Sequence, residues 1–430
     1  TQTLQSGSTL TVAAGATIIN NGSATGFGAT GAVNWDTTPK TTTVTAVSGV
    51  GYFVDTTLGA ITVNLPAGVA GSIVAISDYA NKSATNKITI DPNGTDKING
   101  VNLDSEITTN GAAVTLIYVD ATRGWKDIND ATLNITALTP FVAATGGTVT
   151  ECGDFKIHTF TGPGTFTVTS VGSPAGSNSV EYLVVAGGAG GGGAGGSGGS
   201  GGGGAGGFRQ NFPSPVFAGL PVSDIGYSIT VGGGGAGGFG PCGQRGANGN
   251  PSIFSTITST GGGGGGNNPG TDPGGFPGGS GGGGGYGPTI GGVGNTPPVS
   301  PSQGNPGGSV PGQSRASGGG GGAGAAGGNG PGSSGYPTGS DPAGAGGAGS
   351  SNSISGSSVT YAGGGGGSVY AGTVGAGGPG GGGAGGNPSG GTGVAGTTNR
   401  GGGGGSSGAV SAGTGGAGGS GVVIIRYKFQ

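Results

Sequence analysis

The sequence has few of the residues that ordinarily build an active site. Its 430 residues include one His, two Cys and no Met, and charged residues make up only 7%. Structural zinc sites need four ligands, so His158 with two scattered Cys gives no plausible zinc set. Cys152 and Cys242 lie in different halves of the chain without the spacing of a disulfide framework. A bond between them stays open but unsupported.

The sequence also lacks a basic cluster and a long apolar run. The net charge is -3, and the basic residues are scattered. A protein that binds nucleic acid neutralises phosphates with clustered Lys and Arg, so we expect no nucleic-acid partner. No apolar run approaches the roughly 20 residues that cross a bilayer, so we expect no membrane insertion.

Motifs for catalysis and cofactors are missing as well. Matches to G-x-G-x-x-G occur throughout, but any polyglycine run satisfies that pattern, and no helix is predicted after "VEYLVVAGG". Asp91, Asn93, Asp96 and Asp104 supply oxygen atoms but lack the order of a known calcium loop, so we interpret them as turn residues. No nucleophile has a positioned base. The sequence predicts no enzyme and no cofactor.

Glycine divides the chain into two parts. Of 122 Gly residues, 100 lie in 181–430, and only 22 in the first 180 residues. The first 180 residues carry 7 Lys or Arg and 12 Asp or Glu, whereas the last 250 carry 6 and 4. We therefore expect different interactions to stabilise the folds of the two parts.

The first part reads as short strands. Residues 1–30 form a small β segment that is too short to bury a core and that we expect to anchor or to contact other copies. Residues 31–133 alternate apolar and polar positions, as in "AITVNLP" and "AAVTLIYVD", with turns every 10 to 15 residues. This pattern predicts a β-sandwich or β-barrel module. Residues 134–180 add a β unit in which "FKIHTFTGPGTFTVTSV" reads as a hairpin around "TGPG".

The glycine-rich part, 181–430, has two possible forms. Gly/Ser chains ordinarily behave as flexible coils. Against a coil, the part begins with the strand "VEYLVV" and ends with "GVVIIRYKF", which would pair to close a domain. Its Pro residues also avoid 187–207, and Ala194, Ser197 and Ser200 repeat every three residues.

A period of three is typical of the polyproline II helix, whose backbone groups all point outward. Rods of Gly can pack closely and bond laterally, with Pro at turns and rims because it lacks the N–H group. Ala and Ser at every third position are then expected on the outward side of peripheral rods. Ordering a residue costs about 1–2 kcal/mol, while a net hydrogen bond contributes about 0.5–1.5 kcal/mol. The hydrogen bonds offset the loss of conformational entropy only in a cooperative bundle that is closed at its ends by ordinary side-chain packing.

The predicted fold is therefore all-β, with a C-terminal polyglycine II sandwich closed by terminal strands. Antiparallel rods would bring alternate segments to the same end. The side chains suited to contact sugars or proteins lie between the glycine runs, and the alternative role of each is structural, as a cap of the bundle. They are Phe208, Arg209, Phe212, Phe239, Arg245, Tyr286, Arg315, Tyr336, Tyr361 and Tyr370.

The order of motifs resembles a known family. "VEYLVVAGGAGGGGAGG", "YSITVGGGGAGG", "SIFSTITSTGGGGGG" and "GSGVVIIRYKF" are similar to the glycine-rich domain of bacteriophage tail-fibre and other virion proteins. "NWDTTPKTTTVTAVSGVGYFVDTTLG" and "VTLIYVDATRGWKDI" resemble a β module in structural proteins of marine tailed phages. The resemblance implies a polyglycine II virion fibre, commonly a homotrimer, that attaches to a polysaccharide or outer-membrane protein of the host and contacts other virion proteins.

Two other functions stay open. One is an architectural fibre subunit in which the glycine bundle is a stiff spacer without receptor binding. The other is an extracellular depolymerase, which predicts a clustered carboxylate pair on a β-helix, and the sequence shows no such pair.

Overall fold

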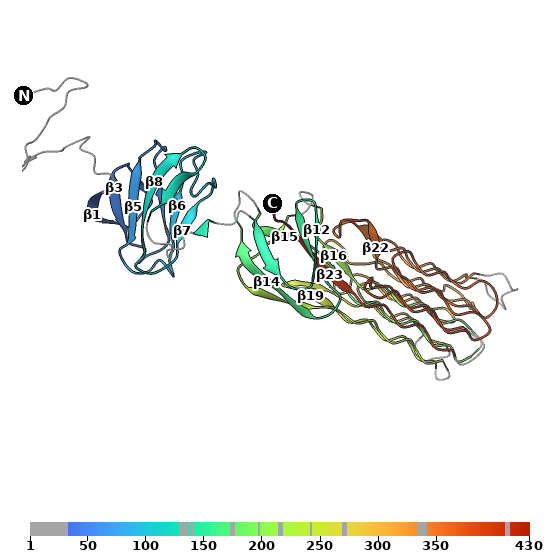
Figure 1. Ribbon diagram of the computed structural model, residues 1–430. Coiled ribbons are helices and arrows are strands. Elements are labelled where there is room, and N and C mark those ends of the chain that lie inside the picture. Colours follow the sequence, from blue (N-terminus) through green and yellow to red (C-terminus); the bar gives the residue numbers. More distant parts are fainter. Residues whose placement is uncertain are drawn as a thin grey trace, which may run out of the picture. The chain divides into compact units, whose positions relative to one another are not determined.

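The computed structural model describes residues 33–128, 136–137, 141–172, 177–196, 198–213, 218–240, 243–268, 273–332, 342–408 and 413–430. The predicted segment 1–30 lies outside these residues. The described residues contain strands but no α-helix, so the fold is all-β, as predicted. The chain forms two compact units, Thr1–Leu138 and Thr139–Gln430 (Figure 1).

The first unit is a sandwich of two sheets. One sheet has the order β1-β3-β5-β8-β9 and the other β10-β7-β6-β4-β2, and neither closes into a barrel. The strands are β1 (Asn34–Lys40), β2 (Val44–Thr45), β3 (Val50–Val54), β4 (Ile61–Asn64), β5 (Ile73–Asp78), β6 (Ile88–Asp91), β7 (Ser105–Ile107), β8 (Ala113–Asp120), β9 (Gly124–Asp127) and β10 (Thr136–Ala137).

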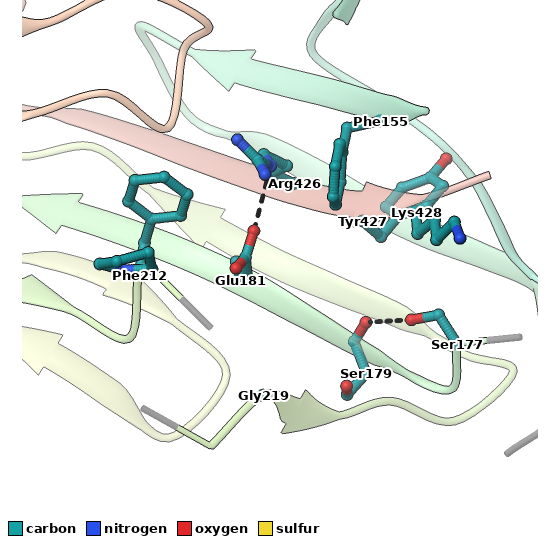
Figure 2. Close-up of a pocket in the computed structure, with 10 residues that line it drawn as sticks. Phe155, Ser177, Ser179, Glu181, Phe212, Gly219, Arg426, Tyr427 and Lys428 are labelled. Atoms are coloured by element: carbon teal, nitrogen blue, oxygen red, sulfur yellow. Dashed lines mark hydrogen bonds and ion pairs between the residues drawn. The ribbon is translucent and has the colours of Figure 1, made fainter. Parts of the chain in front are cut away.

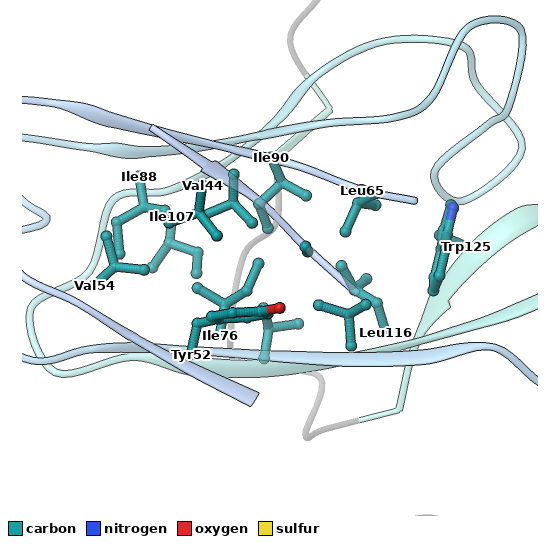
Figure 3. Packing of buried hydrophobic residues seen from close by; sticks show 14 of the residues in the cluster. Val44, Tyr52, Val54, Leu65, Ile76, Ile88, Ile90, Ile107, Leu116 and Trp125 are labelled. Atoms are coloured by element: carbon teal, nitrogen blue, oxygen red, sulfur yellow. The ribbon is translucent and has the colours of Figure 1, made fainter. Parts of the chain in front are cut away.

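The alternation in the sequence marks the core of this unit correctly. Val63, Ile90 and Leu116 are fully buried in one hydrophobic cluster together with Trp125. Figure 3 shows Ile90, Leu116 and Trp125 in this cluster. Burying one such aliphatic side chain contributes about 1.5–3 kcal/mol. The first six strands alternate between the sheets, so β1/β3, β3/β5, β2/β4 and β4/β6 pair in parallel. Alternation specifies the buried face of a strand but not its direction, so the sequence did not predict this pairing.

The second unit combines strands with glycine segments. Its sheets have the orders β11-β14-β18-β19-β20, β12-β13-β23-β15-β16 and β21-β22, and β17 pairs with β15. The strands are β11 (Val142–Thr145), β12 (Thr148–Cys152), β13 (Phe155–Phe160), β14 (Gly164–Val171), β15 (Ser179–Val185), β16 (Phe208–Gln210), β17 (Leu220–Pro221), β18 (Gly226–Thr230), β19 (Ser252–Phe254), β20 (Ile257–Ser259), β21 (Ser350–Asn352), β22 (Val359–Tyr361) and β23 (Val422–Lys428).

The strands that begin and end the glycine-rich part pair as predicted. β15 and β23 are antiparallel neighbours, with Val184 opposite Val423. The predicted hairpin around "TGPG" is wrong, however. β13 pairs with β12 and β23, whereas β14 pairs with β11 and β18 in the other sheet. The chain crosses between sheets there because Phe160 and Phe166 both pack into the core that separates the two sheets.

Beyond the strands, the chain continues as extended rods that bond sideways in a three-residue rhythm. Within rod 186–195, successive N–H groups point to three different rods. Ala186, Ala189 and Gly192 donate to rod 198–207, Gly187, Gly190 and Gly193 to rod 243–250, and Gly188 and Gly191 to rod 413–421. Three-residue periodicity without hydrogen bonds inside the rod is the polyproline II geometry. The prediction of ordered rods, rather than a coil, is confirmed.

The rods form a hexagonal array. Rod 198–207 lies at its centre and bonds to six others, which complete a set of seven inner rods. In the described residues the inner rods are 186–195, 198–207, 260–268, 279–285, 315–322, 362–368 and 401–408. Around them lie eleven outer rods, 232–240, 243–250, 273–278, 288–296, 303–310, 327–332, 342–349, 373–379, 381–386, 391–397 and 413–421. One corner of the outer shell, between rods 243–250 and 273–278, holds no rod of the described residues.

Only glycine fits most inner positions. A Cβ at Gly188 would lie 2.0 Å from the Gly402 oxygen, and one at Gly202 would lie 2.1 Å from the Gly365 oxygen. The hydrogen that a Cβ would replace therefore faces a carbonyl oxygen, which is the arrangement of a Cα–H···O contact.

Pro sorts as predicted, because no described Pro lies in an inner rod. The prediction for Ala and Ser holds only in part. Ala236, Ala345, Ala376 and Ala417 are exposed on outer rods, but Ala and Ser residues are also fully buried in inner rods, among them Ala189, Ala194, Ala205, Ala316 and Ser200. Ser197 lies outside the described residues.

Candidate functional site

The bundle has two distinct ends. At the sheet end the rods continue into β15, β16, β19, β20 and β23, and the chain enters this unit there through β11 (Figure 1). At the opposite end, called the tip, the rods are joined by turns. The turns described there include 286–289, 310–315, 369–373 and 387–391.

Three predicted contact residues converge on the centre of the tip. Tyr286, Arg315 and Tyr370 end the inner rods that flank central rod 198–207. The Arg315 carbonyl accepts from the N–H groups of Gly199 and Tyr370, and its guanidinium lies 4.5 Å from the centre of the Tyr370 ring. The Tyr286 ring lies on Gly198, where a Cβ would come within 2.3 Å of it. All three side chains are half-buried. We call them the tip cluster.

A layer of buried serines supports the tip cluster. The Ser317 hydroxyl donates to the Ser200 carbonyl at 2.6 Å and the Ser368 carbonyl at 2.9 Å, and it accepts from the Ser368 N–H. The Ser200 hydroxyl donates to the Gly192 carbonyl at 2.9 Å. All three serines are fully buried. Their hydroxyls link the inner rods directly below the turns and fix where those turns sit.

Arg245 plays a different part from the tip cluster. Its guanidinium lies 4.2 Å from the centre of the Phe276 ring and donates to the Gly274 carbonyl at 2.6 Å. Phe276 also contacts the site where a Cβ of Gly264 would lie, and the Gly264 N–H donates to the Asn248 side chain. These side chains fill the empty corner of the hexagon. The predicted contact residue therefore completes the bundle.

An apolar hollow of about 520 Å³ lies on the outer side of Phe276. Pro273, Pro277, Pro288 and the exposed Ile290 and Val293 line it, and Arg245 supplies its charged side chain. None of the lining residues that the structure describes is acidic. The hollow is suited to an apolar surface rather than to a neutral sugar, which needs several polar side chains around it.

Phe239 lies on a corner rod near the tip. The chain reaches it through outer rod 232–240, and half of its side chain is exposed. It lies apart from the central rod, so it is peripheral to the tip cluster.

The remaining predicted residues lie at the sheet end. Phe208, Phe212 and Tyr361 are only 8%, 9% and 5% exposed, and all three belong to one hydrophobic cluster with Leu183 and Ile424. They cap the bundle instead of displaying side chains. Arg209 is half-buried beside a hollow of about 320 Å³. Tyr336 and Cys242 lie outside the described residues, and Cys152 is an exposed free thiol.

A cavity of about 400 Å³ that was not predicted from the sequence lies at the sheet end (Figure 2). There the Arg426 Nε lies 3.0 Å from the Glu181 carboxylate, and the guanidinium lies 3.8 Å from the Phe155 ring centre and 4.8 Å from that of Phe212. Glu181 and Arg426 face each other across the β15–β23 pair. The signal was present, because "VEYLVV" carries Glu181 and "GVVIIRYKF" carries Arg426 and Lys428 among apolar residues.

The one histidine is part of the core. His158 Nδ1 lies 2.7 Å from the Gly146 carbonyl, and Nε2 lies 3.1 Å from the Tyr427 hydroxyl. A carbonyl only accepts, so Nδ1 carries the proton and Nε2 accepts from the hydroxyl. Burial lowers the pKa of His158 below its ordinary value of 6.5. The ring is a neutral structural group.

The carboxylates of the first unit hold turns and strand ends. Asp96 accepts from the Gly68 N–H at 2.7 Å, and Asp78 accepts from the N–H groups of Ser83 and Gly111. Burial, followed by the nearby Asp91, raises the pKa of Asp104. No three His, Cys, Asp or Glu side chains gather into a metal-binding group anywhere in the described ranges. Within the same ranges, no helix is long and apolar enough to cross a membrane.

The comparison with known families agrees with this geometry. A family model described as a glycine-rich domain matches residues 160–428, which include the rods, β15 and β23. No curated protein matches the chain.

Proposed function

The chain belongs to the glycine-rich domain family, and from that premise we propose that it is a structural virion fibre protein of a tailed bacteriophage. In this proposal the tip cluster contacts a receptor on the host cell. The sheet end and the first unit would connect the bundle to other virion proteins, and the fibre would be a homotrimer on the particle surface.

The observation that carries the proposal is the convergence at the tip. Tyr286, Arg315 and Tyr370 come from three separate turns, yet they end rods around the same central rod. Aromatic and Arg side chains dominate the energetics of protein recognition surfaces. The hydrogen-bonded rods below hold the side chains of the tip cluster in place, so these side chains lose little conformational entropy on binding.

A purely architectural function is the second candidate. Its support comes from the residues that already have structural partners. Arg245 lies against Phe276, and Phe208, Phe212 and Tyr361 cap the sheet end. A stiff spacer needs these contacts but no receptor.

Adsorption to cells separates the two functions. Labelled full-length protein would be titrated onto a panel of Gram-negative bacteria, with purified lipopolysaccharide and solubilised outer-membrane protein as competitors. A fibre adhesin saturates on some strains, and the competitor that displaces it identifies the receptor class. A spacer saturates on none of them.

The tip cluster is tested with the variant Y286A/R315A/Y370A. Truncating central aromatic and Arg contacts costs about 2 kcal/mol or more, so we expect adsorption to weaken by roughly tenfold or more. The matched control is Arg209→Ala at the sheet end, which should adsorb like the unmodified protein. Equal adsorption of both variants would place the receptor contact elsewhere.

A further inference from the structure

The outer surface of the bundle is an edge at which more rods could add. In rod 232–240 the N–H groups of Gly235 and Gly238 donate inward, whereas those of Gly233, Ala236 and Phe239 have no partner in the described part of the chain. A row of unpaired backbone groups at the side of a sheet is a template for pairing with another molecule. The same reasoning applies to the side of a rod lattice.

Most of the positions at which rods approach one another have no room for a side chain. A Cβ at Gly237 would lie 1.8 Å from the Gly415 oxygen, and one at Gly418 would lie 2.0 Å from the Gly188 oxygen. Contacts this short do not occur between real atoms and would force the rods apart. A side chain at a position of this kind would therefore hinder the close docking of another rod on that face.

The outer rods carry side chains on their outward faces. Exposed or half-exposed residues recur every three positions, and most of them are not glycine. The repeats are Gln244, Ala247 and Asn250; Pro342, Ala345 and Ala348; Thr373, Ala376 and Pro379; and Thr414, Ala417 and Ser420. The faces that point inward from the same rods are glycine, as at Gly375 and Gly378.

The empty corner of the hexagon is closed by longer side chains. An added rod there would accept from the Gly264 N–H, which instead donates to Asn248 Oδ1 at 2.9 Å. The stacked Arg245 and Phe276 side chains occupy the space that such a rod would need. This corner is the one site where a further rod would complete the described array.

We propose that the outward side chains of the outer rods, together with Arg245, Asn248 and Phe276 in the empty corner, prevent the glycine bundles of neighbouring molecules from fusing side by side. The partner that they exclude is a second copy of this chain. Each bundle then stays a separate element of limited width. This inference does not depend on the proposed function, because a spacer needs the same protection.

The test clears one complete outward face in the full-length protein. The variant Q244G/A247G/N250G removes the side chains of this one face of rod 243–250 and leaves Arg245 and Asn248 at the corner unchanged, and Q244A/A247S/N250S keeps a Cβ at each position. Sedimentation velocity over a range of concentrations is compared with the unmodified protein. We expect the glycine variant alone to form a species of roughly twice the mass, since two cleared faces pair isologously.

A second variant opens the empty corner. R245G/N248G/F276G should associate in the same way, while R245K/F276Y should behave like the unmodified protein. Amide exchange reports whether the inner rods stay intact. If both glycine variants keep protected inner rods and sediment like the unmodified protein, the proposal is overturned. Loss of inner-rod protection in Q244G/A247G/N250G would also overturn it, because the structure gives those side chains no internal hydrogen bond.

Discussion

At the residue scale, the few hydroxyls inside the lattice are disproportionately important. An all-glycine rod shifted by three residues would meet nearly the same backbone partners, because the bonding pattern repeats at that interval. In the observed register Ser200, Ser317 and Ser368 lie together, and each hydroxyl bonds to a backbone group of a neighbouring rod. A shift by three residues would separate the three serines, so the serine layer favours the observed register.

Ser317→Ala tests this role. The substitution removes a buried hydroxyl that donates to two carbonyls and accepts from the Ser368 N–H. The Ser368 N–H and the two carbonyls keep backbone hydrogen bonds to one another and to the Ser317 N–H. We therefore expect the loss of a net hydrogen bond, about 0.5–1.5 kcal/mol, in urea unfolding. Ser353→Ala, at an exposed position, is the control and should change little. Equal stability of both variants would contradict the assigned role.

His158 gives the protein a pH dependence. Its pKa is lowered by burial, so the unfolded chain takes up a proton at a higher pH than the folded chain. The stability contribution is complete above 6.5, the ordinary value, and is lost as the pH falls below it. Urea unfolding between pH 7.5 and about 5 measures this loss. His158→Gln removes the titrating group. If the free energy of unfolding of this variant still falls with pH as it does in the unmodified protein, the prediction is refuted.

At the element scale, a rod derives its stability from its neighbours. One isolated rod loses about 1–2 kcal/mol per residue in conformational entropy and has no internal hydrogen bond to offset it. In the lattice each inner rod donates to and accepts from as many as six others. The strands that continue these rods supply the ordinary hydrophobic contacts of the two clusters around Phe166 and Leu183.

Gly202→Ala measures how tightly the rods approach. The added methyl group would lie 2.1 Å from the Gly365 oxygen, so the central rod has to move. Overpacking of this kind costs about 1–3 kcal/mol, and we expect the melting temperature to fall. Gly162→Ala is the matched control, because nothing lies within 4 Å of its Cβ position. Tolerance of Ala at 202 would mean that the rods are further apart than described.

At the scale of the whole molecule, the hexagonal array makes the protection of an amide from hydrogen exchange depend on how deep its rod lies in the bundle. The inner rods are bonded on nearly all sides, whereas the outer rods present unpaired groups to solvent. Amides exchange fastest where local opening is least costly. Deuterium uptake should therefore be slowest in 186–195 and 198–207 and faster in outer rods such as 232–240. Uniformly rapid uptake throughout the glycine segments would show that the part is a coil.

Much of this arrangement was predictable from local sequence. All seven inner rods lie in the purest glycine runs, and Pro marks outer rods and turns. The pairing of β15 with β23 followed from two apolar strands at the ends of one glycine-rich part. Whether a turn lies at the tip or at the sheet end was not predictable, because this depends on the position of every preceding reversal of the chain. For that reason Phe208, Phe212 and Tyr361, which resemble the tip residues in sequence context, lie at the sheet end.

The sequence by itself determined the kind of packing that each part can use. Glycine at almost every position permits close backbone packing and allows no side-chain core, whatever the global arrangement. The tertiary structure alone decided which rods are surrounded, which corner stays empty and which aromatic residues meet at the tip. These features depend on lateral hydrogen bonds between segments far apart in the chain, and identical glycine repeats carry no local information about their partners.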